Sequence, residues 1–176
     1  MNSTWFFIPI LLFVIWGFID ILYVTIRFGV GPMPSTKKAI KKAATFVESH
    51  HEIIYEIGGG FGRPAKYFAQ IFPQKKIILI EISSFSCFIA KLYCRNITNI
   101  EIQRGNLLHY NFRDNAFIYG YLYPSLMQSL SKRLKNWKGR IVSYTFSFRN
   151  QKEEQMLKLS KSHSDKLYIY DFRKSR

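Results

Sequence analysis

The chain has few acidic residues and few cysteines, and these shortages limit the partners and the disulfides that the protein can have. Only 11 Asp and Glu stand against 26 Lys and Arg in 176 residues, a formal net charge of +15. Such an excess implies an anionic partner, which can be a membrane surface, a nucleic acid or an acidic protein. Cys87 and Cys94 are seven residues apart on a predicted helix, too far for an unstrained disulfide. We expect both to be reduced core residues of a cytosol-facing domain.

Two kinds of chemical motif are also missing. The G-K-[ST] sequence of a phosphate-binding P-loop does not occur, which argues against a P-loop nucleotide hydrolase. The four histidines, His50, His51, His109 and His163, have no metal-ligand spacing and no cysteine partner, so we expect no metal. Apolar residues still make up 48% and aromatic residues 17%. That composition supports one packed domain and excludes a disordered chain.

One long apolar segment, residues 5–26, stands at the N-terminus and contains a single charged residue, Asp20. As a helix it would be about 33 Å long, enough to cross the hydrocarbon core of a bilayer. A cleavable signal peptide is the alternative, but no Lys or Arg precedes the segment and no Ala-x-Ala site follows it. We therefore expect a retained transmembrane anchor and linker at residues 1–30 and one domain at residues 31–176.

Basic residues follow the apolar segment and predict its orientation. Arg27 and four lysines at 37, 38, 41 and 42 all lie C-terminal to it. The positive-inside rule then predicts a single-pass protein whose domain faces the cytoplasm and meets anionic lipid. Asp20 has two interpretations. It either marks a functional path in the membrane, or it lies near the cytoplasmic end and reaches toward Arg27, which we favour.

The rest of the chain alternates between helical and strand patterns. The predicted helices cover 35–49, 63–72, 83–96 and 124–137, and the predicted strands cover 51–57, 75–82, 100–105, 115–123, 139–148 and 166–172. Residues 151–162 fit either a helix or a polar connection. Strands separated by helices favour an α/β fold with a mostly parallel sheet. The last two strands have no clear helix between them, so we expect an antiparallel edge.

Four of the five residues 58–62 are glycine, directly after the first predicted strand. A glycine run costs backbone entropy and is kept where the chain turns tightly or approaches a ligand. Parallel sheets bind ligands at the carboxyl ends of their strands. The pattern Glu56, Gly58, Gly60, Gly62 would let the backbone pass under a nucleoside with no Cβ in the way.

Polar residues at the ends of the next two strands favour a nucleoside over the alternatives. Glu81 can accept hydrogen bonds from ribose hydroxyls, and Asn106, followed by Leu107, can reach an adenine edge. A dinucleotide pattern, G-x-G-x-x-A, also fits residues 60–65, but it leaves two glycines unexplained and the chain has no room for a substrate domain. The remaining alternative is that the glycines only make a turn.

These motifs resemble a known family. The sequence IYEIGGGFG, followed by IILIEI and IQRGNL, is similar to the cofactor motifs of class I S-adenosylmethionine-dependent methyltransferases. More narrowly, residues 31–172 resemble small membrane-anchored lysine methyltransferases that act on the ATP synthase c subunit and the adenine nucleotide translocase. The shared features include GPMPST, YLYPSLM and RIVSYTF. The family usually has PxxPT where PMPST stands, and aspartate where Phe61 and Asn106 stand.

The resemblance implies a Rossmann-like methyltransferase sheet, S-adenosyl-L-methionine as cofactor, and methylation of a lysine in a membrane protein. It makes Tyr121 and Tyr123 candidates for the wall beside the sulfonium, where aromatic rings favour positive charge. Pro34 and Ser35 either fold over the cofactor as a lid or merely precede a helix cap. A cofactor-binding module without turnover, or methylation of a lipid, quinone or RNA, remain alternatives. The sequence does not identify a catalytic base.

Overall fold

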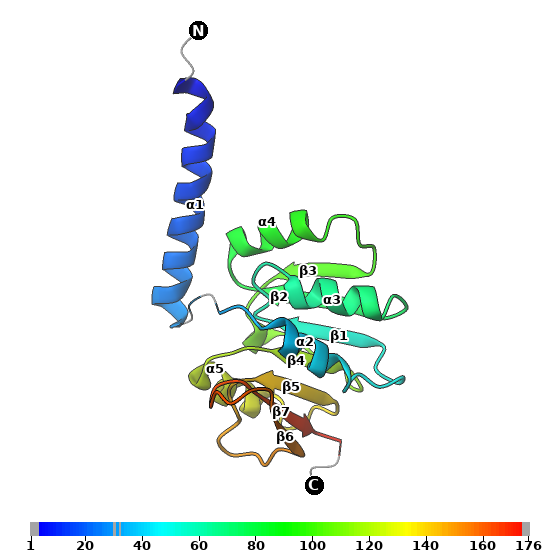
Figure 1. The fold of residues 1–176 in the computed structure, drawn as a ribbon. Helices are drawn as coiled ribbons and strands as arrows, with labels where there is room; N and C mark the ends of the chain where they lie inside the picture. The colour runs from blue at the N-terminus through cyan, green and yellow to red at the C-terminus, as the bar shows by residue number, and fades with distance from the viewer. Residues whose placement is uncertain (1–3, 30, 32, 174–176) are drawn as a thin grey trace.

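The computed structural model describes residues 4–29, 31 and 33–173, and it is a three-layer α/β domain with one long helix beside it (Figure 1). The helices are α1 (Thr4–Phe28), α2 (Lys37–Ala44), α3 (Arg63–Ile71), α4 (Ser84–Tyr93) and α5 (Pro124–Arg133), with a 3-10 turn η1 (Leu107–His109). The strands are β1 (Ile53–Ile57), β2 (Lys76–Glu81), β3 (Ile100–Arg104), β4 (Phe117–Gly120), β5 (Arg140–Tyr144), β6 (Gln155–Lys158) and β7 (Lys166–Asp171).

The sheet has the strand order β3-β2-β1-β4-β5-β7-β6. The pairs among β1 to β5 are all parallel, whereas β7 runs antiparallel to both β5 and β6. The expected α/β fold with an antiparallel edge is therefore confirmed. Strands are added on one side of β1 up to β3 and then on its other side from β4, so the carboxyl ends of β1 and β4 flank the switch point, where such sheets bind ligands.

Two apolar layers cover the two faces of the sheet. One layer joins α2 and α3 to strand residues such as Ile54, Leu79 and Val142. The other joins α5 to strand residues such as Tyr55 and Ile80. Successive side chains of a strand point to opposite faces, so the unbroken apolar strands of the sequence supply both layers. Cys87 and Cys94 are buried free thiols, as expected.

Some boundaries differ from the sequence prediction. The first body helix ends at Ala44 rather than at residue 49, and Thr36 caps its start by accepting a hydrogen bond from Ala39 N–H. β5 ends at Tyr144 because Thr145 takes a left-handed conformation, φ 73°, which breaks the strand. Residues 151–162 contain no helix; β6 lies there instead and pairs with β7.

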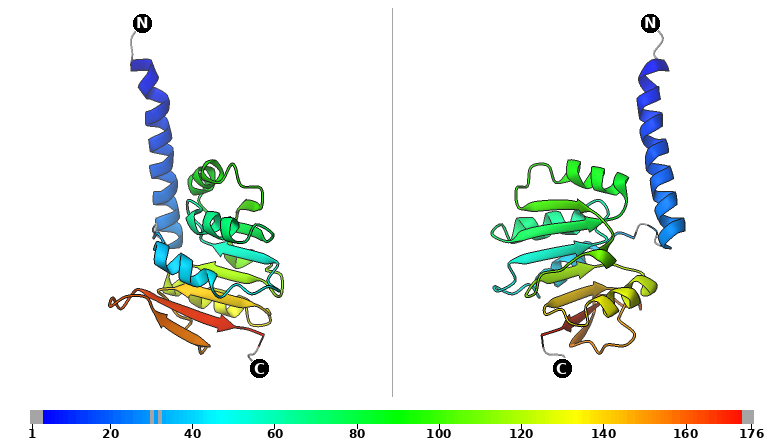
Figure 2. Two further views of the ribbon diagram at one scale, coloured as in Figure 1. Left: turned by 45° about the vertical axis from the view of Figure 1, so that its right-hand side comes forward. Right: turned by 180° about the vertical axis from the view of Figure 1, so that it is seen from behind.

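Helix α1 lies beside the body and packs against α4, as both orientations in Figure 2 show. Residues Phe6–Phe28 are long and apolar enough to cross a membrane by length and composition, and only 11% of the window is buried. Its contacts with the body run along one face, where Gly17 and Val24 are buried. Asp20 does not turn toward Arg27: its hydrogen bonds go to the start of α4.

His51 lies just before β1, at the amino ends of the parallel strands. It is fully buried, and its Nδ1 accepts a hydrogen bond from Glu48 N–H. Burial, reinforced by the positive charges of His50 and Arg173, lowers the pKa of His51 to about 4. Between pH 6.5 and 4 the unfolded chain therefore binds the proton that the folded chain rejects. Stability should fall as the pH falls through this window.

We expect the free energy of unfolding to drop by about 2 kcal/mol from this group between pH 6.5 and 4.5. Denaturant titrations of the detergent-solubilised protein at several pH values would measure it. The His51→Gln variant should lose this part of the pH slope, while His109→Gln, at an exposed position, should keep it. An unchanged slope in His51→Gln would contradict the assignment.

Candidate functional site

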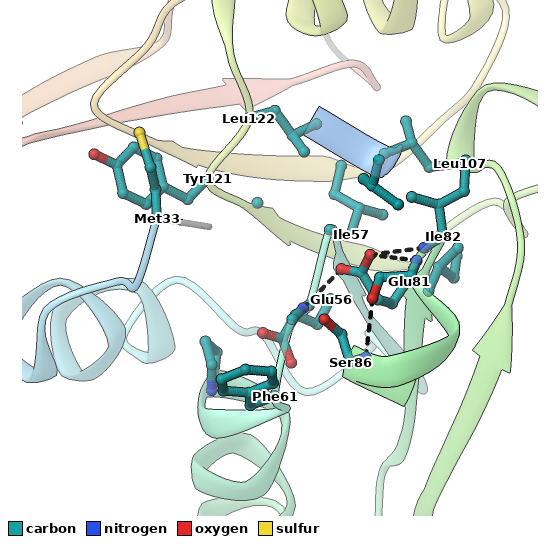
Figure 3. Close-up of a pocket in the computed structure, with 18 of the residues that line it drawn as sticks. Met33, Glu56, Ile57, Phe61, Glu81, Ile82, Ser86, Leu107, Tyr121 and Leu122 are labelled. Carbon is teal, nitrogen blue, oxygen red and sulfur yellow. Dashed lines mark hydrogen bonds between the residues drawn. The ribbon is translucent and has the colours of Figure 1, made fainter. Parts of the chain in front are cut away.

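A cavity of about 740 Å³ lies at the carboxyl ends of β1, β2 and β4 (Figure 3). Every site residue predicted from the sequence except one lines it: Pro34, Ser35, Glu56, Gly58, Gly60, Glu81, Asn106, Leu107, Tyr121 and Tyr123. Gly62 does not line the cavity. It takes a left-handed conformation at the start of α3 and packs its Cα against Leu79 and Ala90.

The glycine loop bends because alternate residues take positive φ angles. Gly58, Gly60 and Gly62 have φ angles of 65°, 53° and 80°, a region that favours glycine. A Cβ built on Gly60 would meet no atom within 4 Å, so this residue faces open space in the cavity. A Cβ on Gly59 would lie 2.5 Å from Leu79, so Gly59 is required for packing. The backbone of the loop is therefore open to a ligand at Gly60.

Glu81 ends β2 and organises the backbone around it. One carboxylate oxygen accepts hydrogen bonds from Ile82 and Ser83 N–H at 2.8 and 2.9 Å, and the other accepts Gly60 N–H at 2.8 Å. A carboxylate has about four acceptor positions. Glu81 therefore keeps about one for a ligand in this geometry, and accepting both hydroxyls of a ribose requires one of these bonds to open.

Glu56 lies one strand away, with 3% of its surface exposed. Its Oε2 accepts a hydrogen bond from Ala65 N–H at 2.6 Å. Burial raises the pKa of Glu56 well above its ordinary value, and the nearby charge of Glu81 raises it further. Within the described part of the chain neither carboxylate has a Lys, Arg or His within salt-bridge distance. A cationic ligand beside them would favour the ionised form of Glu56 and lower its raised pKa.

Asn106 is a further polar group of the site. Its Oδ1 accepts a hydrogen bond from Leu108 N–H at 3.0 Å and caps the turn η1. The amide nitrogen remains as a donor for a ligand. Leu107 beside it is 8% exposed and supplies an apolar wall.

One wall of the cavity is aromatic. The ring of Tyr121 lies 4.7 Å from the ring of Tyr144, and the ring of Tyr123 stacks on Phe146 at 6.2 Å. Tyr119 is 1% exposed and also lines the cavity. Burial is the main cause that raises the pKa of Tyr119 above its ordinary value, so the phenol is neutral.

The segment before α2 supplies the helix cap and also part of the cavity wall. Thr36 caps α2, while Pro34 and Ser35 line the cavity together with Met33. Both the cap and the cavity wall are therefore built from the same short stretch.

Sequence analysis missed the contribution of α1. Ile21, Val24 and Phe28 line the cavity, although the sequence treated the apolar helix as a separate anchor. Because these residues are three and four positions apart, they lie on one face of the helix. That spacing was visible, but an apolar helix has such residues on every face, so nothing in the sequence distinguished this one.

Two of the histidines lie together with a glutamate, as potential metal ligands. Glu48, His50 and His51 bring ligand atoms within 4.8 Å of one another. The carboxylate of Glu48 already pairs with Arg140, and the Nδ1 of His51 already accepts a hydrogen bond. Two arginines beside the cluster, Arg140 and Arg173, oppose a cation there.

No protein-family profile and no curated protein matches the chain in sequence. Solved structures do match. An RNA methyltransferase from Salinibacter ruber, solved with S-adenosyl-L-homocysteine, superimposes with a TM-score of 0.72 at 18% identity, covering 82% of this chain and 96% of its own. The 23S rRNA methyltransferase ErmE gives a TM-score of 0.60 at 12% identity, covering 80% of this chain and 70% of its own.

A third structure is a SAM-dependent methyltransferase from Geobacter sulfurreducens, also solved with S-adenosyl-L-homocysteine. It gives a TM-score of 0.51 at 16% identity and covers 68% of this chain and 53% of its own. The S. ruber enzyme is matched over nearly its whole length. The chain therefore has the fold of the S-adenosylmethionine-dependent methyltransferases.

Proposed function

We propose that the protein is a membrane-anchored methyltransferase that uses S-adenosylmethionine and methylates a lysine of a membrane protein. One observation carries the cofactor assignment. Two buried carboxyls, Glu56 and Glu81, have no cationic partner among the described residues and lie at adjacent strand ends, beside a glycine loop that opens into the cavity. This arrangement fits a ligand that carries both positive charge and ribose hydroxyls.

Each residue of the site then has a role toward the cofactor, which supplies a methyl group on a positively charged sulfur. Glu81 accepts a hydrogen bond from the ribose, and Asn106 donates to the adenine. Gly60 lets the backbone lie close to the methionine part, and Glu56 balances its ammonium charge. The acceptor nitrogen attacks in line, so positioning is the main contribution of the protein.

The aromatic wall supports an amine acceptor. A lysine can attack only as the neutral amine, and an apolar cavity lowers its pKa by disfavouring the charged form. Tyr121 and Tyr123 would line the wall beside the sulfonium, because aromatic faces favour cationic groups. No Asn-Pro-Pro-Tyr motif occurs, which argues against methylation of the amino groups of bases or glutamine.

The apolar helix and the charge of the chain support a membrane location. Full crossing of a bilayer core needs about 20 apolar residues, which α1 has. The basic residues that follow α1 favour a domain on the cytoplasmic side, against anionic lipid. Phe88 and Leu92 on α4, 40% and 50% exposed, add apolar surface beside α1 where the body would meet the bilayer.

RNA is the second candidate acceptor, because the net charge of +15 would attract a polyanion and two structures of similar fold are RNA methyltransferases. A binding module without turnover is the third possibility. An assay of methyl transfer distinguishes these three possibilities, because they predict label in protein, in RNA or in no fraction.

The test is transfer of a labelled methyl group to isolated membranes and to total RNA by the full chain in detergent. We expect label in a membrane protein, at a lysine after hydrolysis, and none with Glu81→Ala. Label in RNA, lipid or quinone would overturn the lysine assignment. Binding of S-adenosylhomocysteine without transfer to any fraction would identify a module without turnover.

A further inference from the structure

Helix α1, which is long and apolar enough to cross a membrane, also lines the cavity. One face of it, Gly17, Asp20, Ile21, Val24 and Phe28, is turned toward the body. The last three of these residues are part of the cavity wall. The opposite face is apolar and open, with Phe18 and Ile19 at 67% and 58% exposure. The helix therefore has one face for lipid and one for the site.

Asp20 satisfies the free N–H groups at the start of α4. One carboxylate oxygen accepts hydrogen bonds from Ser84 Oγ at 2.6 Å and from Ser84 N–H at 3.3 Å. The other accepts from Ser83 Oγ and, at 3.3 Å, from Phe85 N–H. The first N–H groups of a helix have no partner within the helix, and its N-terminus favours negative charge. Asp20 supplies both the acceptors and the charge.

Only two hydrogen bonds separate Asp20 from Glu81. The hydroxyl of Ser83 donates to Asp20, while the backbone N–H of the same residue donates to Glu81 Oε1 at 2.9 Å. The position of Ser83 is thus fixed from both sides. A displacement of α1 would shift Ser83 and loosen the carboxylate that is placed to bind the ribose.

Close packing sets the distance between α1 and α4. Gly17 lies against Phe85: a Cβ there would be 2.7 Å from the ring. The rings of Phe13 and Trp16 lie 5.3 and 5.2 Å from the ring of Phe85, and Trp16 also meets Phe88 at 5.5 Å. A larger residue at Gly17 must displace the ring of Phe85 or move the two helices apart.

From these contacts we propose that the apolar helix is a component of the cofactor site, and that Asp20 is a positioning residue that holds Glu81 through Ser83. The inference rests on the proposed function, because it concerns binding of the same cofactor. It implies that the site is complete only when α1 is seated on α4. Membrane insertion and cofactor affinity are then coupled through one helix.

Calorimetry with S-adenosylhomocysteine, on the full chain in detergent, tests the proposal. Asp20→Ala should weaken binding by about tenfold, and Asp20→Asn, which keeps one oxygen acceptor, by less. Gly17→Leu should act in the same direction without removing any polar group. The controls are Asp114→Asn, which removes a charge from an exposed loop far from α1, and Phe18→Leu on the open face of the helix. Both controls should bind like the wild type.

Two further readouts separate positioning from general damage to the fold. Hydrogen exchange of the ligand-free protein should be faster at residues 82–87 in Asp20→Ala, with the rest of the sheet unchanged. In the methyl-transfer assay the KM for S-adenosylmethionine should rise, while kcat at saturating cofactor should stay within about twofold, because Asp20 touches no reacting atom.

The outcomes are distinct. Wild-type protein that binds no S-adenosylhomocysteine would overturn both the proposed function and this inference. Wild-type binding with equal affinity in Asp20→Ala and Gly17→Leu would overturn the inference alone. A loss of affinity in Asp20→Ala that is accompanied by faster exchange throughout the sheet would also overturn it, since the effect would then be unfolding.

Discussion

Replacing Glu81 by alanine is expected to weaken binding of S-adenosylhomocysteine by about 100-fold, because hydrogen bonds to a charged group each contribute about 1.5–3 kcal/mol. The substitution removes the ribose acceptor. It also leaves the N–H groups of Gly60, Ile82 and Ser83 without the oxygens that they meet now. The glycine loop and the start of α4 would both lose the carboxylate that they share, so the expected loss of affinity exceeds that of one hydrogen bond.

Isothermal calorimetry on the full chain would measure this loss, with thermal unfolding as a check that the variant still folds. Glu101→Ala is the matched control, since Glu101 is a half-exposed carboxylate on the neighbouring strand β3 that pairs with Lys76. It should bind like the wild type. Glu81→Gln should fall between the two, because the amide keeps one acceptor oxygen. Equal affinities in Glu81→Ala and Glu101→Ala would show that Glu81 does not bind the ligand.

Much of this site was predictable because its residues sit at the ends of apolar strands. Glu81 and Asn106 follow such strands directly, and the carboxyl ends of parallel strands meet at one edge of the sheet. The glycine pattern then identified the loop where the backbone bends. These are local signals, and the topology of a parallel sheet brings them together without further information.

The partner of Asp20 was not predictable in the same way. Ser83 and Ser84 lie more than 60 positions along the chain, and the sequence offered Arg27 as a nearer partner. Strand β6 was missed for a different reason. Three of its four residues are exposed and only two are apolar, because an edge strand does not need to be apolar on both faces. The lysines around it resemble the exposed surface of a helix.

The second large effect is expected at Arg140, which lies at the opposite edge of the sheet from the cavity. Its guanidinium is nearly buried and pairs with Asp171 at 3.0 Å, with Glu154 at 3.5 Å and with Glu48. The side chain of Asp171 is only 1% exposed. Burial raises the pKa of Asp171, but hydrogen bonds from Arg173 and Arg140 outweigh it and hold this pKa well below the usual range.

Arg140→Met keeps most of the side-chain volume but removes the charge that three carboxylates share. Removing one member of a buried ion network typically costs about 3–5 kcal/mol, because the desolvated charges that remain are poorly compensated. Arg173 still pairs with Asp171, so we expect the lower value, about 3 kcal/mol, in the free energy of unfolding. Urea titration in detergent would measure it.

The control for this prediction is an exposed ion pair in the same sheet. Lys76→Met removes the partner of Glu101, where both side chains are about half exposed, and such pairs contribute about 1 kcal/mol or less. Equal stability of Arg140→Met and Lys76→Met would contradict the network. Folded Arg140→Met should bind S-adenosylhomocysteine within about twofold of the wild type, because none of the described network residues lines the cavity. Stability and cofactor affinity are therefore set at opposite edges of one sheet, and the two variants Arg140→Met and Glu81→Ala should separate them.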